Sequence, residues 1–505
     1  MKGKNLIVVA IIFIYFLNII KTDPAGVRIA IKDESIKKVQ MKLLPLLIDE
    51  LNKVTVPNQH IDVDVKLATL HINLNNIKFH VDSLLPENVS VVFNEPNKIN
   101  VSGSNIKGNG SVEAQYKLLF VSETDNIDIK INKLNFNIEV TLSRKESTKE
   151  KGKFLPYAEI TNVVLDLDFD FDIHGSIIAN IISLVKGLIK NSLTNVIVGP
   201  LKDIIKDESK KALDNLIQII PVYVPIMDNG LAVDYSVLSD PKVTKNYLIL
   251  SSYGGIVNLN NPATKTPPYI VPDNLPDFIE NNKSVQVFLS EFSIDTALNS
   301  LFLSNLLNIA MKTEDIPGPV KFNTSTIDIV INGLEKMYGK DKDIVLDCKS
   351  SDSPPVVHFK DGKATGDSIG QCTLQVRLDS GELDDALSFK STISFVGIAN
   401  IQEGGKISGK VLSLAISNTT LIASKVPGTD IKQVEGLFNL AVQFGLPTLN
   451  EYLKSITIPL PTFEGITFND SVATINDNYA TAEVSVTVSE SFEKFLRRKV
   501  SEEII

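Results

Sequence analysis

The chain has 505 residues, of which 43% are hydrophobic, 22% charged and only 7% aromatic, and its formal net charge is −10. This composition is typical of a folded protein with two or more domains and argues against a disordered chain. The excess of acidic residues argues against a broad nucleic-acid-binding surface, so we expect no nucleic-acid partner.

Residues 1–22 have the pattern of a secretory signal peptide. Lys2 and Lys4 precede an apolar run over residues 6–20 that only Asn18 interrupts, as in a cleaved leader. The alternative is an uncleaved membrane anchor, but the run is shorter than the about 20 apolar residues that a span needs. We therefore expect cleavage, which removes three lysines and no acid and changes the net charge from −10 to −13.

Two further features suit the secretory pathway and predict a protein that is secreted or kept in the endolysosomal or phagosomal lumen. Cys348 and Cys372, the only two cysteines, form a disulfide in an oxidising compartment or remain two buried free thiols. Seven N-x-S/T triplets are candidate glycosylation sites. They are Asn88, Asn100, Asn109, Asn282, Asn323, Asn418 and Asn469.

The first half of the chain begins with a strand and a helix. Residues 26–57 start as a short strand and continue with apolar positions at helical spacing. Residues 60–174 consist of alternating apolar and polar runs separated by Gly, Asn and Pro, which predicts a twisted antiparallel meander. Residues 176–217 return to helical spacing, and residues 218–226 close the unit with a proline-punctuated strand.

An aspartate ladder lies at the end of the meander, in the sequence LDLDFDFDIHG at residues 165–175. Asp166, Asp168, Asp170 and Asp172 alternate with large apolar residues, which is the period of a strand with one buried and one solvated face. The alternative is a calcium loop, but such a loop needs small residues or glycine between its carboxylates. The pattern therefore favours a strand over a metal site.

The second half repeats the element order after a linker rich in Pro and Asn. Residues 284–311 again combine a strand with an amphipathic helix, and alternating runs follow. We expect the last helix, at residues 434–453, to be interrupted near Gly445 and Pro447. Residues 454–463 then close this half with another proline-punctuated strand.

The shared order of elements predicts a duplicated domain. A twisted sheet around amphipathic helices forms an elongated barrel, and an interior dominated by aliphatic side chains suits acyl chains. The predicted boundaries are 1–22 for the signal peptide, 23–257 for the first barrel, 258–277 for the linker and 278–505 for the second barrel.

Four segments carry a resemblance to a known family: GVRIAIKDESIKKVQMKLLPLLIDELNKVTVP (26–57), the strand and helix at 163–193, VQVFLSEFSIDTALNS (285–300) and ITIPLPTFEGITFNDSVATI (456–475). In order and placement they resemble the family of bactericidal/permeability-increasing protein, lipopolysaccharide-binding protein and the plasma lipid transfer proteins. The resemblance implies an α+β fold of two similar elongated barrels. Each barrel is a twisted antiparallel sheet wrapped on two amphipathic helices, and a central sheet joins the two in a boomerang shape.

The resemblance also implies one apolar lipid pocket in each barrel, lined by the two helices. In the first barrel these positions are Ile36, Val39, Leu43, Leu47, Ile177, Ile181, Leu184 and Leu188. In the second barrel they are Leu298, Leu301, Phe302, Leu306, Leu437 and Leu440. The alternative for each position is ordinary hydrophobic core, because an apolar helix stripe serves either purpose.

Two departures from the family pattern concern the first domain, namely the rigidity of its barrel and its charge. The better-known animal members tie the long helix of the first domain to its sheet with a disulfide, whereas this chain has no cysteine before Cys348. The bactericidal members have a cationic first domain, whereas residues 23–230 contain 24 Lys and Arg against 27 Asp and Glu. The second departure weakens the case for lipopolysaccharide.

A basic loop, SRKESTKEKGK at residues 143–153, is the local exception to this acidity. Its cations are Arg144, Lys145, Lys149, Lys151 and Lys153. At a barrel tip such a loop would contact anionic headgroups. The alternative is a solvated hairpin loop, as most charge runs are.

One segment fits a catalytic sequence motif. GDSIG at residues 366–370 matches G-x-S-x-G, with Ser368 at the nucleophile position. The motif needs a helix after it and a later histidine, but a strand follows and no histidine occurs after His358. We therefore expect a turn between strands and no catalytic residue. The five histidines, expected to be partly exposed strand residues and not ligands, are His60, His71, His80, His174 and His358.

The sequence thus supports two functional hypotheses. The first is a monomeric, non-enzymatic lipid-binding or lipid-transfer protein without metal or cofactor. Such a protein would hold phospholipid or lipopolysaccharide, touch a membrane or bacterial envelope transiently and act in antibacterial defence. The second is a structural or adhesive secreted glycoprotein without lipid cargo. Two long helices beside each meander favour the first, because an adhesive β-sandwich does not need them.

Overall fold

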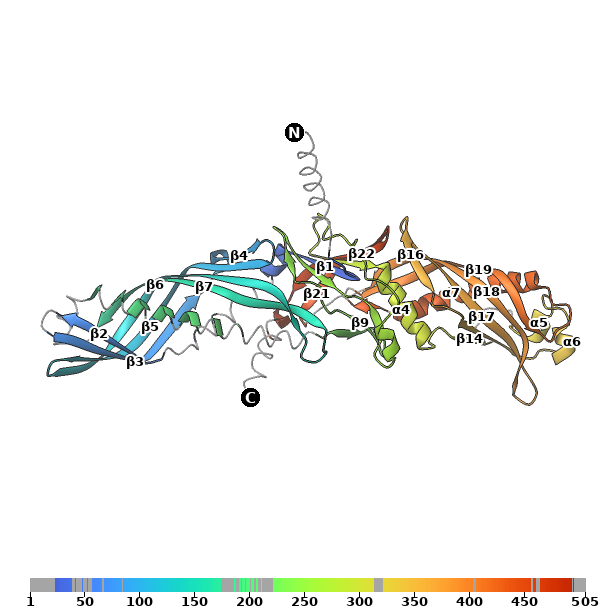
Figure 1. Ribbon diagram of the computed structural model, residues 1–505, viewed down its shortest axis with the longest axis horizontal. Helices are drawn as coiled ribbons and strands as arrows, with labels where there is room; N and C mark the ends of the chain where they lie inside the picture. Colours follow the sequence, from blue (N-terminus) through green and yellow to red (C-terminus); the bar gives the residue numbers. More distant parts are fainter. Residues whose placement is uncertain are drawn as a thin grey trace, which may run out of the picture.

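The computed structural model describes residues 23–494 except 39–40, 42–47, 49–51, 53–56, 66–67, 84, 174–185, 188–189, 192, 196, 200, 204–205, 208–209, 211–220, 313–320, 403–405, 456, 460–463 and 493. Figure 1 shows an elongated molecule with a curled sheet at each end and a central sheet between them. Among the residues so described, no helix has the length and apolar character needed to cross a bilayer.

The central sheet combines strands from both halves of the chain. Its strand order is β10-β11-β1-β13-β22-β21. The bounds are β1 (Val27–Lys32), β10 (Lys242–Val243), β11 (Tyr247–Ser252), β13 (Val285–Ser290), β21 (Ile466–Asn476) and β22 (Tyr479–Val488). Because β1 pairs antiparallel with β13, the first strand of one half is hydrogen-bonded to the first strand of the other.

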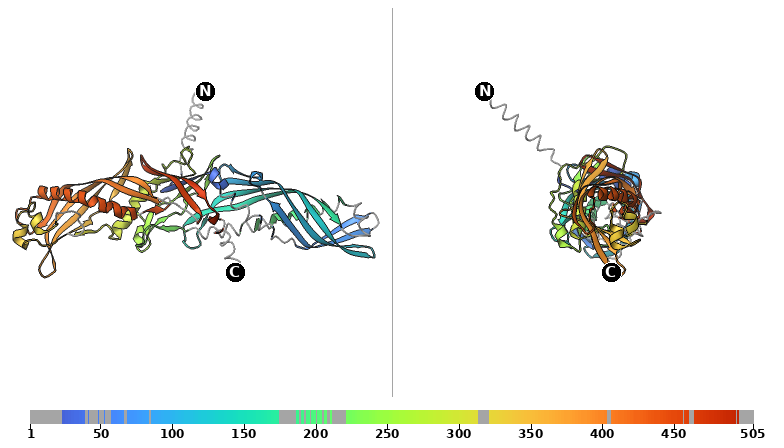
Figure 2. Two further views of the ribbon diagram at one scale, coloured as in Figure 1. Left: turned by 180° about the vertical axis from the view of Figure 1, so that it is seen from behind. Right: turned by 90° about the vertical axis from the view of Figure 1, so that its right-hand side faces the viewer.

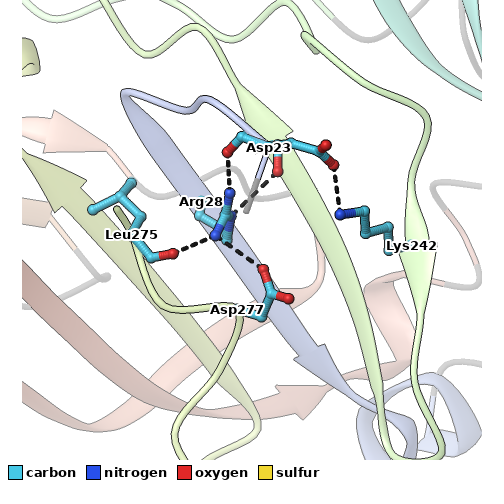
Figure 3. Close-up of polar contacts among 6 residues, drawn as sticks. Asp23, Arg28, Lys242, Leu275 and Asp277 are labelled. Carbon is cyan, nitrogen blue, oxygen red and sulfur yellow. Dashed lines mark hydrogen bonds and ion pairs between the residues drawn. The ribbon is translucent and has the colours of Figure 1, made fainter. Parts of the chain in front are cut away.

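A buried arginine fixes the middle of this sheet (Figure 3). The Arg28 side chain is fully buried, and its Nη1 lies 2.9 Å from Oδ1 of Asp277. The guanidinium also donates to the backbone carbonyls of Leu275 and Asp23, and Lys242 pairs with the Asp23 carboxylate at 2.7 Å. A buried charge is tolerated only when it is paired and hydrogen-bonded. These contacts therefore hold the proline-rich segment around Leu275 against the central sheet.

A long, curled sheet forms the first half. Its order is β2-β3-β5-β6-β7, with β4 paired to β5. The bounds are β2 (Gln59–Val65), β3 (Ala68–Ser83), β4 (Val89–Asn94), β5 (Lys98–Leu118), β6 (Val121–Glu146) and β7 (Phe154–Ile173), with the 3-10 turn η1 (Pro86–Asn88) before β4.

The aspartate ladder lies on the outer face of β7. Phe169 and Phe171 are buried, whereas Asp170 and Asp172 are exposed. The predicted strand is therefore confirmed.

Helical residues pack inside the first-half sheet. Residues 33–38 form a helix, and the described residues between 186 and 210 are helical. Leu193 and Ile197 are each 1% exposed and pack in the same core as the inner face of the sheet. The helix predicted over residues 176–217 therefore covers the sheet where it is described.

The second half repeats the arrangement with a seven-stranded sheet. Its order is β14-β15-β17-β18-β19-β20, with β16 paired to β17. The strands are β14 (Ile309–Lys312), β15 (Ile344–Ser350), β16 (Val356–Lys360), β17 (Lys363–Arg377), β18 (Leu383–Gln402), β19 (Lys406–Ser424) and β20 (Ile458–Pro459). The helices are α4 (Glu291–Leu303), α5 (Thr324–Ile327), α6 (Leu334–Tyr338) and α7 (Ile431–Ser455). The end-on view in Figure 2 shows this sheet curling around α7.

One disulfide links two paired strands of this sheet. Cys348 on β15 lies directly opposite Cys372 on β17, and their sulfur atoms are bonded. The disulfide predicted from the two cysteines is present, and the alternative of two free thiols is excluded.

The last helix is not interrupted, so the predicted break near Gly445 and Pro447 is wrong. α7 runs for 25 residues with Pro447 inside it. Side-chain amides on either side of the proline bind the helix to the strand β19. Asn439 exchanges hydrogen bonds of 2.8 and 2.7 Å with the backbone of Ile416, and Asn450 exchanges bonds of 2.8 and 2.9 Å with that of Val411. These bonds compensate for the one that proline removes from the helix.

A small three-stranded sheet, ordered β12-β9-β8, lies between the halves. Its strands are β8 (Tyr223–Pro225), β9 (Leu231–Asp234) and β12 (Ile256–Asn258), and the 3-10 turn η2 (Pro262–Lys265) follows. The domain boundaries proposed from the sequence stay a prediction.

Candidate functional site

An apolar cavity of about 350 Å³ lies in the second half, between the curled sheet and its two long helices. Its size is within the range of small-molecule sites, roughly 300–1,000 Å³. Ile294, Leu298 and Leu301 of α4 line one side, and Leu449 and Leu453 of α7 line another. Because aliphatic and aromatic side chains dominate the lining, the cavity suits a hydrocarbon chain better than a polar ligand.

The local sequence of α4 explains why its leucines face the cavity. Hydroxyl groups three and four positions apart occupy the opposite face of this helix and are buried. Ser293 donates to the carbonyl of Gly26 at 3.0 Å. Thr296 accepts from the N–H of Ile256 at 2.9 Å, and Ser300 donates to the carbonyl of Ile256 at 2.8 Å. The polar face is thus bound to Gly26, the residue before β1, and to β12, and the apolar face is left for the cavity.

Two carboxylates of α4 bind the edge strand β16, whose side chains Val357 and Phe359 also line the cavity. Asp295 Oδ1 accepts from the N–H of Val357 at 2.9 Å, and Glu291 accepts from the N–H of Phe359. The pKa of Asp295 is raised to about 6, mainly by burial and also by the neighbouring Glu291, while the N–H of Val357 and the nearby His358 oppose the shift. This contact between helix and strand therefore contains a group that titrates in mildly acidic solution.

The structure places five of the six lipid-pocket residues predicted for the second half, and their surroundings differ. Leu298 and Leu301 line the cavity. Phe302 lines a separate hollow of about 280 Å³ at the end of α4, and Leu306 is 37% exposed in the turn that follows. Leu437 packs against a different core, which contains Val434 and Phe438. The side chain of Leu440 lies outside the described residues.

α7 contacts two separate apolar regions, which explains why Leu437 is not at the cavity. The N-terminal half of the helix packs with Phe389 in the closed core of the second half. Among its described side chains, Leu449 and Leu453 of the C-terminal turns reach the cavity. Apolar residues recur at helical spacing along the whole of α7, so the sequence does not show which end of the helix faces the cavity.

In the first half, the structure describes one of the eight predicted pocket residues. Ile36 packs against a small cluster that contains Val91, Phe93 and Leu142. The other seven residues lie outside the described residues: Val39, Leu43, Leu47, Ile177, Ile181, Leu184 and Leu188.

The sequence reasoning missed the strand residues of the cavity. Phe395 on β18 and Val411 on β19 line it, together with Gly397 and Gly409 on the same two strands. Glycines that alternate with apolar residues on paired strands leave room for a cavity, because they have no side chain to fill it. This spacing in residues 395–411 was the available signal.

The basic loop does not lie at a barrel tip, so that expectation is corrected. Lys153 forms an ion pair with the buried Asp234 of β9 and lies 4.7 Å from the ring centre of Tyr253. Arg144 stacks on Phe154 at 4.9 Å. The loop therefore packs against the small sheet at the centre of the molecule.

The other cations of the loop differ in their contacts. Lys145 lies 4.6 Å from the ring centre of Tyr157. Lys149 and Lys151 are exposed. Contact with headgroups stays a prediction for these three residues, at a place different from the one expected.

Ser368 does not lie in a turn, contrary to the expectation from GDSIG. It lies inside β17, and its hydroxyl oxygen is 3.4 Å from that of Ser350. A strand that continues on both sides does not present the serine as a nucleophile elbow does.

The chain matches known proteins in sequence and in fold. The sequence model described as "LBP / BPI / CETP family, C-terminal domain" matches residues 225–488. The chain belongs to this family. It is 22% identical over 252 residues to the human BPI fold-containing family C protein, a match that covers 48% of this chain and 47% of the relative. The chain thus spans about half the length of that relative.

Two further relatives of the LBP/BPI/CETP family are similar to the chain. Bovine lipopolysaccharide-binding protein is 21% identical over 90% of this chain and 92% of its own. Mouse phospholipid transfer protein is 23% identical over 53% of each chain. A crystal structure of lipopolysaccharide-binding protein covers 92% of this chain and 99% of its own with a TM-score of 0.54 at 18% identity. The expected fold of two barrels and a central sheet is therefore confirmed.

Proposed function

We propose that this protein is a non-enzymatic lipid carrier that shields acyl chains of a phospholipid or lipopolysaccharide from water. The observation that carries the proposal is the apolar cavity between α4 and α7. Membership of the LBP/BPI/CETP family supports lipid binding or transfer in general.

The binding energy of such a carrier comes from removing methylene groups from water. Each buried methylene contributes about 0.8 kcal/mol, so about ten of them supply roughly 8 kcal/mol, which corresponds to micromolar dissociation from water. No charged contact is needed, and the headgroup stays at the mouth of the cavity. We therefore expect lipid affinity to depend weakly on salt.

An exposed apolar turn offers the contact with a membrane. Between β5 and β6, Leu119 is 64% exposed, Phe120 100% and Val121 47%. Leu118, the residue before this turn, pairs with Leu70 near the start of β3, and Figure 1 shows β2 and β3 at the outer end of the first half. The turn thus lies at the end of the first half away from the centre. An exposed aromatic side chain partitions into a lipid interface, so this turn is better suited to touch a bilayer than the basic loop is.

Charge favours phospholipid over lipopolysaccharide as the cargo. The formal net charge is −10, and residues 23–230 are slightly acidic. An acidic protein is repelled by a strongly anionic ligand unless a local cation cluster compensates. A zwitterionic phospholipid does not require such a cluster.

The proposal includes export through the secretory pathway and glycosylation. Among the seven triplets, Asn109, Asn282, Asn418 and Asn469 are exposed. Asn323 is 6% exposed, and its side chain accepts from the N–H of Thr326 at the start of α5. It is a poor glycan acceptor, because its amide is already bound inside the fold.

The test measures the movement of fluorescent phosphatidylcholine between two vesicle populations, with and without the purified protein. We expect catalytic amounts of protein to accelerate transfer, and Phe120→Ser to weaken vesicle binding about 30-fold, since burying this side chain contributes about 2 kcal/mol. Ile270→Ser is the control, because Ile270 is 92% exposed but lies outside the turn. No acceleration of transfer would contradict the proposal and leave the adhesive glycoprotein as the alternative.

The non-enzymatic part of the proposal has its own check. We expect no ester hydrolysis by the wild-type protein and no difference for Ser368→Ala. Hydrolysis that Ser368→Ala abolishes would contradict it.

A further inference from the structure

Two histidines and an aspartate meet on the outer face of the first-half sheet. His60 and Asp62 are two positions apart on β2, so both side chains are on the same face. His71 of β3 lies directly opposite Asp62, and Asn73 directly opposite His60. The ligand atoms of His60, Asp62 and His71 all lie within 4.8 Å of one another. The register of one hairpin thus brings together groups that are 11 positions apart in the chain.

The distances show that the three groups converge on one point. Asp62 Oδ1 lies 2.9 Å from His60 Nε2 and 2.6 Å from His71 Nδ1. The two imidazole rings are stacked, with centres 6.0 Å apart and planes inclined by 17°. A four-coordinate zinc ion with bonds of about 2.0–2.1 Å holds its ligand atoms about 3.3 Å apart. Small movements of exposed side chains are therefore sufficient to admit an ion.

A neighbouring amide orients the first histidine for this purpose. His60 Nδ1 lies 2.6 Å from Asn73 Oδ1. When Nδ1–H donates to that oxygen, the lone pair of Nε2 faces the Asp62 carboxylate, and a proton or a cation must lie between them. Metal-binding histidines commonly donate their second N–H to an oxygen in this way, which fixes the tautomer and the direction of the ring.

We propose that His60, Asp62 and His71 form a binding site for a divalent transition-metal ion such as zinc. Two imidazoles and one carboxylate suit a borderline ion, whereas calcium and magnesium prefer oxygen ligands alone. Three protein ligands leave at least one position for water or for a ligand from another molecule.

The location indicates what the ion does to the fold. β2 is the edge strand of the first-half sheet and is hydrogen-bonded only to β3 within that sheet. An ion held by His60 and Asp62 of β2 and His71 of β3 links this edge to its neighbour across the hairpin. Metal binding thus stabilises an edge of the sheet, where the backbone is paired on one side.

The experiment titrates zinc into tag-free, metal-stripped mature protein by calorimetry and repeats the titration with His60→Ala and His71→Ala. The expected result is one zinc ion per chain in the wild type, and affinity at least about 10-fold weaker in each variant. His80→Ala is the matched control, because His80 is also exposed on β3 but lies outside the cluster. All four proteins are first compared by circular dichroism and thermal melting.

A second readout uses cobalt(II), which absorbs visible light when it is bound in a low-symmetry site. The wild type and His80→Ala should give this band, and His71→Ala should lose it. Equal zinc affinity in the wild type, His60→Ala and His71→Ala would overturn the proposal, as would displacement of the zinc by millimolar magnesium.

Discussion

Filling the cavity at Gly409 should abolish most lipid binding without harming the fold. Gly409 lines the cavity on β19, between Ile407 and Val411, which line it too. The three residues pair in regular register with Ile401, Ala399 and Gly397 of β18, so a side chain at position 409 shares their face. A Cβ added at Gly409 meets no atom within 4 Å. Gly409→Leu therefore places its side chain in the space proposed for the acyl chain.

The expected loss follows from the methylene groups displaced. A leucine side chain excludes about four methylene-sized groups of the ligand at about 0.8 kcal/mol each, or about 3 kcal/mol in total. This corresponds to roughly 100-fold weaker binding. The thermal midpoint should not fall, because replacing glycine in a strand with an apolar residue is intrinsically favourable.

The assay is the displacement of a fluorescent fatty-acyl phospholipid from the purified protein. Gly436→Leu is the matched control, because Gly436 is exposed on the N-terminal half of α7 and its added Cβ also meets no atom within 4 Å. We expect the control to bind like the wild type. Wild-type affinity in a folded Gly409→Leu variant would refute the assignment of this cavity as the lipid site.

Three further predictions concern stability. Arg28→Met should lower the free energy of unfolding by about 3 kcal/mol, since it removes a buried cation from its oxygen partners, and an unchanged urea midpoint would contradict the role of Arg28 in the central sheet. Asp295 has a folded-state pKa of about 6, whereas its ordinary value is 3.8. The free energy of unfolding should therefore fall as the pH rises from about 4 to about 6, and above pH 6 the loss should reach about 3 kcal/mol. Asp295→Asn should therefore be more stable than the wild type at pH 7 and equal to it below about pH 4 in thermal melts, and a pH-independent difference would refute this. Cys348→Ser should lower the free energy of unfolding by about 3 kcal/mol, because it removes the disulfide with Cys372 that restricts the unfolded chain. The urea midpoint should fall, and reduction of the wild type should lower it by the same amount.

Local periodicity predicted much of the architecture. The alternation along residues 165–172 identified β7 and its solvated aspartates, because a strand's side-chain period is a property of the chain alone. In α4, Leu298 and Leu301 were proposed as pocket residues from the family resemblance, and both line the cavity. These residues are close to the strand that begins the half, so their environment follows from the local element order.

Long-range packing decided what the sequence did not predict. α7 is 25 residues long, or about 37 Å, and it passes from a closed core to the cavity, so Leu437 and Leu449 have different surroundings. Its continuity through Pro447 depends on amide bonds to β19, which no local rule anticipates.

The histidine cluster was missed for a related reason. His60 and His71 are 11 positions apart in the chain, so their spacing alone does not indicate that they meet. Only the register of β2 against β3 brings these groups together.

Native mass spectrometry of the purified protein, followed by organic extraction of anything that dissociates, would show whether the protein carries lipid in its apolar cavity. We expect a mass increment of one or two phospholipids per chain, reduced in Gly409→Leu and retained in Gly436→Leu. A lipid-free mass that stays unchanged after incubation with phospholipid and with lipopolysaccharide would contradict it.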